Sequence, residues 1–242
     1  MRVIPVVGVV NTPRGDGYWE VAADGGVFGY GKAGFYGSMG STHLAAPVVG
    51  MAATPSGKGY WLVGADGGIF GFGDAHFYGS MGGKPLNKPV VGMAATPNGG
   101  GYWLVASDGG IFGFGNARFY GSMGGKPLNK PVVAMSATPG GAGYWMVASD
   151  GGIFGFGDAH FYGSMGGATL NKPVVGMDAT PSGHGYWLVA SDGGIFGFGD
   201  AKFYGSLGTN PPRTPVRGIA AMPPGLGYRL VDAGGEAFLF HP

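Results

Sequence analysis

The apolar positions of the chain fall into short runs separated by Gly, Pro and Asp. In the unit that begins at Pro89, the runs are Val90 to Ala95, Tyr102 to Ser107, Ile111 to Phe114 and Arg118 to Met123. Each run has the length of a β-strand and is bounded by residues that favour turns. No window longer than about 10 residues carries a helical apolar period free of Gly or Pro. The pattern predicts an all-β protein with four short strands in each unit.

The same unit recurs with a period of 42 residues, without insertion or deletion. A tryptophan marks the second predicted strand of the first five units, and Arg229 stands at that place in the sixth. The repeated tryptophans are Trp19, Trp61, Trp103, Trp145 and Trp187, and the prolines that open the units are Pro5, Pro47, Pro89, Pro131, Pro173 and Pro215. We therefore divide a single domain, residues 1–242, into units 5–46, 47–88, 89–130, 131–172, 173–214 and 215–242.

Both faces of the predicted strands are apolar. Along the second strand, Tyr102 and Leu104 point to one side, while Trp103 and Val105 point to the other. A four-stranded sheet that is buried on both faces and repeated is typical of a β-propeller blade, and we expect the Trp and Tyr of this strand to be core. Counting strands predicts six blades, the last incomplete. A five-bladed ring with an extra hairpin, or an offset closure in which the N-terminal strand joins the last blade, are the alternatives.

Composition favours an ordered chain, although 56 Gly and 18 Pro among 242 residues would be typical of disorder. The chain is 45% hydrophobic and 14% aromatic but only 11% charged, which is enough apolar surface for a core. The net charge of +1 disfavours nucleic acid and anionic membranes as partners. There is no uninterrupted apolar run of about 18 residues and no signal-peptide pattern at the start, so we expect a soluble chain without membrane insertion.

Catalytic and metal-binding patterns are weak. The chain has no Cys, which excludes disulfides, thiolate metal sites and Cys nucleophiles. Residues 29–34 match a phosphate-binding glycine motif, but no helix follows them. Ser80 and its equivalents lack the first Gly of a nucleophile elbow, and the five His do not share one register. We expect no enzyme, no cofactor and no metal site, and keep a hydrolase in the central channel as the third alternative.

A set of polar residues remains, repeated around the predicted ring. The hairpin turn after the second strand carries Asp, and the linker into the next unit carries Asn-Lys in three units. Because the strands alternate in direction, turn and linker are expected on the same face of the ring. A carboxylate, an amide and an ammonium beside aromatic residues would suit a sugar. The candidate ligand-binding residues are Asp66, Asp108, Asp150, Asp192, Asn87, Asn129, Asn171, Lys88, Lys130 and Lys172. The alternative is structural: a tight turn for each Asp and a solvated linker for each Asn-Lys.

A second, weaker set is expected on the opposite face. It combines Asp74, Asp158 and Asp200 with His76, His160 and Lys202.

The run GYWLVASDGGIFGFGDAKFYGS, residues 185–206, resembles the tandem repeats of many exported or surface-associated actinobacterial proteins, sometimes appended to hydrolases. The resemblance covers nearly the whole chain and implies a propeller that is secreted or lies at the cell surface. A weaker likeness, at the level of the fold, is to the five-bladed sugar-binding lectin propellers called tachylectins.

The units are nearly identical, and none carries a set of catalytic residues of its own. This favours a non-enzymatic, multivalent binding module for carbohydrate or the cell-envelope surface. The alternative is a structural or protein-interaction component, such as a rigid docking disc in an envelope or phage assembly. The sixth unit ends on its third strand, which leaves an apolar edge at 237–242. We expect this edge to pair with another chain or to be shielded by the N-terminal segment.

Overall fold

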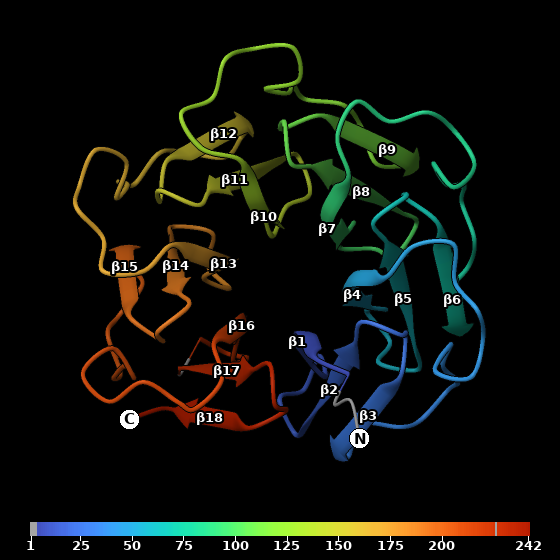
Figure 1. Ribbon diagram of the computed structural model, residues 1–242, viewed down its shortest axis with the longest axis horizontal. Helices are drawn as coiled ribbons and strands as arrows, with labels where there is room; N and C mark the ends of the chain where they lie inside the picture. The colour runs from blue at the N-terminus through green and yellow to red at the C-terminus, as the bar shows by residue number, and fades with distance from the viewer. Residues whose placement is uncertain (1–3, 226) are drawn as a thin grey trace.

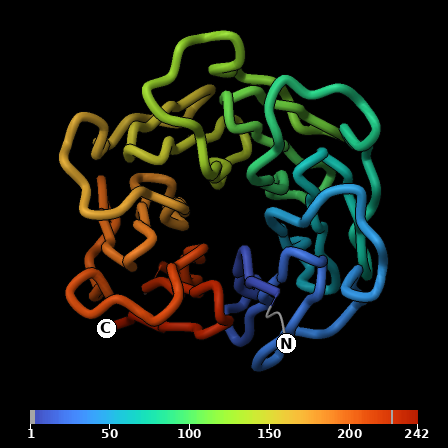
Figure 2. The backbone as a smooth tube through the Cα atoms, viewed as in Figure 1, coloured from blue at the N-terminus to red at the C-terminus, as the bar shows by residue number. Residues whose placement is uncertain are grey.

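The ring of sheets in Figure 1 comes from a computed structural model, which describes residues 4–225 and 227–242. These residues form 18 strands in six antiparallel sheets of three strands each, one sheet per unit, and no helix. The first strand of every unit lies toward the axis, and β16 lies beside β1, so the sheets form a closed propeller-like ring. The trace in Figure 2 shows the first and the last unit, blue and red, side by side.

The strands recur at the same place in every unit. The inner strands are β1 (Val6–Asn11), β4 (Val48–Ala53), β7 (Val90–Ala95), β10 (Val132–Ala137), β13 (Val174–Ala179) and β16 (Val216–Ala221). The middle strands are β2 (Gly17–Ala22), β5 (Gly59–Gly64), β8 (Gly101–Ala106), β11 (Gly143–Ala148), β14 (Gly185–Ala190) and β17 (Tyr228–Asp232). The outer strands are β3 (Val27–Gly31), β6 (Ile69–Gly73), β9 (Ile111–Gly115), β12 (Ile153–Gly157), β15 (Ile195–Gly199) and β18 (Ala237–Phe240).

The number of sheets agrees with the predicted number of units. Neither alternative closure is seen, because β1 pairs with β2 of its own unit and the sixth unit forms its own three-stranded sheet. All-β structure is confirmed for the described residues, but the predicted four-stranded blades are not seen, since each sheet has three strands.

The hydrophobic core lies between neighbouring sheets. Trp103 of β8 is fully buried, its ring centroid lies 5.6 Å from that of Tyr144 in the next unit, and its indole Nε1 donates to the Arg118 carbonyl at 2.7 Å. On the other face of β8, Tyr102 packs against Trp61 of the previous unit at 5.7 Å. These large rings bury apolar area on both faces of each sheet. The prediction that the repeated Trp and Tyr are core is confirmed for all five Trp and for the Tyr of units two to six, whereas Tyr18 of unit one is only partly buried.

The run predicted as a fourth strand crosses from its own sheet to the next one. We call residues 117–123, and their equivalents 33–39, 75–81, 159–165 and 201–207, the crossing segments. Tyr120 donates its amide N–H to the Tyr144 hydroxyl at 3.2 Å and its own hydroxyl to the Gly141 carbonyl at 3.2 Å, and Tyr144 donates to the Gly121 carbonyl at 2.6 Å. Because the sheets diverge away from the axis (Figure 1), the segment fills the wedge between them instead of adding a strand.

Two glycines make room for this crossing. A Cβ on Gly113 of β9 would lie 2.4 Å from the Ala117 carbonyl oxygen, so the segment can lie directly on the outer strand only because that side chain is absent. Gly121 has a φ of +138°, and a Cβ there would lie 2.4 Å from the Phe156 ring of the next unit. The conformation and the close approach both require Gly.

The junction between units six and one differs from the other five. Arg229 replaces the repeated Trp, and its guanidinium lies 3.8 Å from the centre of the Tyr18 ring. Arg229 also donates to the Asn11 side chain, and Asn11 donates to the Ala221 carbonyl of β16 at 2.9 Å. Glu20 is buried in this junction at a position where the middle units carry Leu or Met. A polar network therefore takes the place of the aromatic packing where the ring closes.

The outer strand of unit six is covered on the face toward unit five. Tyr204 and Gly205, in the crossing segment of unit five, lie against Tyr228 and Phe240 as in the other units. On the other face of β18, toward unit one, Leu239 is 46% exposed, and pairing of 237–242 with another chain stays a prediction.

Candidate functional site

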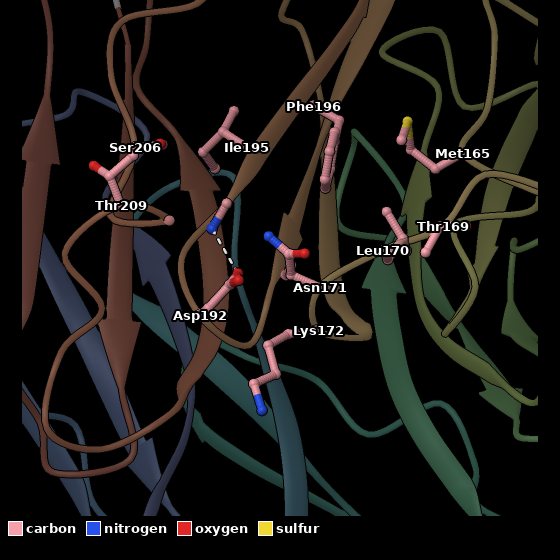
Figure 3. Close-up of a pocket in the computed structure, with 13 residues that line it drawn as sticks. Met165, Thr169, Leu170, Asn171, Lys172, Asp192, Ile195, Phe196, Ser206 and Thr209 are labelled. Carbon is pink, nitrogen blue, oxygen red and sulfur yellow. Dashed lines mark hydrogen bonds between the residues drawn. The ribbon is translucent and has the colours of Figure 1, made fainter.

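One of the predicted grooves is a cavity between units four and five. Asn171 and Lys172 come from the linker into unit five, and Asp192 comes from the turn between β14 and β15; Figure 3 shows the three side chains next to one another. Leu170 and Phe196 contribute apolar surface to the same cavity, whose volume is about 310 Å³. The cavity thus combines an amide, an ammonium and a carboxylate with an apolar wall.

The groove between units three and four repeats this arrangement. Asn129, Lys130 and Asp150 line a cavity of about 290 Å³ together with Leu128 and Phe154. The structure therefore brings together two of the predicted residue sets at equivalent places in the ring.

The two remaining turns differ in what faces them. The linker before Asp108 carries Asn87 and Lys88, the same two residue types that precede Asp150 and Asp192 in their units. Asp66 follows a linker that carries Ala at the corresponding positions 45 and 46, so its groove lacks the amide and the ammonium.

Each candidate Asp also shapes its own turn. The Oδ1 atom of Asp192 accepts the Gly194 N–H at 3.0 Å, and Asp66, Asp108 and Asp150 make the same bond. This is the hydrogen bond of an Asx turn, which stabilises the tight hairpin. The other carboxylate oxygen of Asp192, Oδ2, accepts no hydrogen bond from the described residues. That oxygen is left to accept from a ligand hydroxyl, so the structural role and the binding role are compatible.

Two carboxylates of the opposite-face set, Asp74 and Asp200, serve internal structure. Asp74 accepts from the Thr54 hydroxyl at 2.8 Å and from the Ser56 hydroxyl at 2.5 Å, and Asp200 does the same with Thr180 and Ser182. Burial acts to raise the pKa of Asp74, but the hydrogen bonds from Ser56 and Thr54 outweigh it and hold the pKa below its ordinary value. These carboxylates brace the turn between the inner and middle strands and leave little acceptor capacity for a ligand.

The axial channel contains residues that the sequence analysis overlooked. At one end, five valines and Arg217 surround a cavity of about 270 Å³. Asp178 of β13 lines the cavity at the other end, with Ser136 of β10. Asp178 accepts from the Ser136 hydroxyl at 3.0 Å and from the Ala221 N–H at 2.8 Å, and burial raises its pKa. The signal was present, because the equivalent positions in the other units hold Val, Ala or Ser.

Asp178 is better explained as a brace than as a catalytic group. Its two carboxylate oxygens connect three neighbouring inner strands, β10, β13 and β16. Among the described residues, Asp178 is the one carboxylate that lines this cavity, whereas glycoside hydrolysis needs a pair. Within residues 4–225 and 227–242, no three His, Cys, Asp or Glu side chains gather closely enough to hold a metal ion.

Comparison with protein-family models and with curated proteins finds no match to this chain. In the described residues no helix is long and apolar enough to span a membrane.

Proposed function

We propose that the protein is a non-enzymatic β-propeller module that binds carbohydrate or a cell-envelope polymer at several equivalent grooves. The observation that carries this proposal is the recurrence of one chemical set, Asn, Lys and Asp with an apolar wall, in two cavities of about 310 and 290 Å³. Such a set offers both donors and acceptors to hydroxyl groups and an apolar surface to the face of a sugar ring.

The size and number of the grooves favour a repeated ligand. Both cavities lie at the small end of the range for ligand sites, which suits one or a few sugar units. Weak sites that recur around one rigid ring bind a repetitive polymer through avidity. Such polymers lie at the cell surface, so a secreted or surface location follows from the same proposal.

The test is a glycan array followed by titration with cell-wall polysaccharide. The Asp150→Asn, Asp192→Asn double variant keeps the turn-forming Oδ1 acceptor but removes a negative charge from each cavity. We expect its apparent affinity to fall by about tenfold or more, because two sites weaken at once. Asp66→Asn is the matched control, since its groove lacks Asn and Lys, and it should bind like the unmodified protein. Equal loss in both variants, or no binding to any glycan, would contradict the proposal.

A second candidate function is a structural or protein-interaction component, such as a docking disc. It is favoured by a phenylalanine in each crossing segment that is between 64% and 67% exposed: Phe35, Phe77, Phe119, Phe161 and Phe203. Exposed aromatic residues are enriched at protein interfaces. A pull-down from the source cells should then recover a defined protein partner, and replacing Phe77, Phe119 and Phe161 by Ser should abolish its recovery without lowering glycan binding.

A further inference from the structure

The ring has six junctions but five crossing segments. Each segment leaves the outer strand of one unit and packs on the Tyr of the middle strand in the next unit. Units two to six receive a segment in this way. Unit one would receive it from unit six, whose last described residues are those of β18 and the two that follow it. No described residue takes this place.

The face of unit one shows the consequence. Phe28 and Tyr30 of β3 are 49% and 40% exposed, whereas the equivalent Phe70 and Phe72 of β6 are partly buried in the junction with unit one. Tyr18 stacks on Tyr30 with a centroid distance of 4.7 Å and an interplanar angle of 12°. The wedge beside β3 is therefore an aromatic surface without the cover that its five counterparts have.

The covered units show which groups this wedge offers. In unit two, the Tyr60 hydroxyl donates to the Gly37 carbonyl at 2.6 Å and accepts from the Tyr36 N–H at 3.1 Å. The Tyr36 hydroxyl donates to the Gly57 carbonyl at 3.1 Å. The equivalent groups in unit one are the Tyr18 hydroxyl and the Gly15 carbonyl, and neither has such a partner among the described residues.

We propose that the wedge between β18 and β3 binds a short extended peptide of the crossing-segment type, Phe-Tyr-Gly-Ser-Met. The peptide Tyr would donate its hydroxyl to the Gly15 carbonyl, and the following Gly would lie on the ring of Tyr30 and accept from the Tyr18 hydroxyl. The five occupied junctions carry the assignment, because they show the same sequence on the same surface.

One residue limits the length of this peptide. Leu239 of β18 stands where the other outer strands carry Gly. In those strands the Gly lies against the Ala that stands two residues before the crossing Phe. Leu239 is 46% exposed and occupies that part of the wedge. The site therefore accepts the motif from its Phe onward, and not the Ala two residues earlier.

The experiment uses a fluorescently labelled Phe-Tyr-Gly-Ser-Met peptide and the intact protein, with binding followed by anisotropy. We expect saturable binding of one peptide per chain. Replacing the peptide Gly by Ala should weaken binding by about tenfold or more, since a Cβ at this position meets the facing ring in every occupied junction. In the protein, Tyr18→Phe should weaken binding by about fivefold through the lost hydrogen bond. Tyr60→Phe removes the same hydroxyl from a covered unit and should leave peptide binding unchanged.

Three results would overturn the proposal. They are absence of saturable binding, equal binding of the Gly-to-Ala peptide, and equal loss in Tyr18→Phe and Tyr60→Phe. Light scattering without peptide tests a different occupant: a dimer that the peptide dissociates would show that a second copy of the chain fills the wedge. The peptide variants keep the test independent of how either Tyr substitution affects folding.

Discussion

The stability of this protein should fall as the pH rises from 5 to 8, and one buried carboxyl group should cause much of the change. Glu20 of β2 is 1% exposed, and its Oε1 atom has no hydrogen-bond partner in the described residues. Burial is the largest effect on this group, and repulsion from Asp232 adds to it, while Tyr30 and Arg229 favour the charged form. Together they raise the pKa of Glu20 from an ordinary value of 4.5 to about 7.

The sign follows from proton linkage. The folded state holds this proton more tightly than the unfolded state, so between pH 4.5 and about 7 the unfolded chain loses the proton first. Stability therefore decreases as the pH rises through this window and levels off above it. A pKa change of that size corresponds to about 3 kcal/mol over the full titration, of which about 2 kcal/mol falls between pH 5 and pH 8.

Urea denaturation at pH 5 and at pH 8 measures the effect. Glu20→Gln removes the titration, so the variant should be more stable than the unmodified protein at pH 8, and its own stability should change less between the two pH values. Glu236→Gln, at the other and exposed glutamate, is the matched control. Burial also raises the pKa of Asp178, but this residue is present in every variant and cancels in the comparison. An unchanged pH dependence in Glu20→Gln would refute the reasoning.

Further predictions concern packing. Trp103→Ala should lower the free energy of unfolding by about 3–5 kcal/mol, because it opens a cavity between sheets and leaves the Arg118 carbonyl unpaired, whereas Lys130→Ala should change it by less than about 0.5 kcal/mol. Chemical denaturation of both variants is the measurement, and a near-neutral Trp103→Ala would contradict the interlocked core. Gly121→Ala should cost at least about 1 kcal/mol in the same assay because of its positive φ and the close Phe156 ring. Gly92→Ala is its control, since unit four already carries Ala134 at that position, and equal losses would exclude the crossing-segment explanation.

The repeat predicted much of the fold because its signals are local. The turns, the apolar runs and the 42-residue period are properties of neighbouring residues. The destination of the crossing segment is not local. Arg118 to Met123 has the composition of a strand, but its hydrogen bonds go to Tyr144 and Gly141 in the next unit. Strand propensity indicates that the side chains suit a half-buried surface. It does not indicate which backbone the segment will pair with.

The candidate groove was predictable for a similar reason, and the closing junction was not. Turn Asp and linker Asn-Lys repeat with one spacing, so strand alternation alone brings them to one face. Arg229 and Tyr18 are at opposite ends of the chain, and their contact at 3.8 Å exists only because the ring closes. Arg229 is visible in the sequence as a change in the repeat, but its physical role, a cation over the Tyr18 ring in place of Trp, is visible only in the structure.

The repeated grooves and the single wedge beside β3 should bind their ligands with different stoichiometries. Ligands of the grooves should bind in more than one copy per chain, because the Asn, Lys and Asp set recurs, and their affinity for a polymer should exceed that for a single sugar. The wedge beside β3 exists once, because five crossing segments cover five of the six junctions. A measurement of stoichiometry therefore distinguishes the two sites without any mutation: several sugars but one peptide should bind to each ring, and neither should compete with the other.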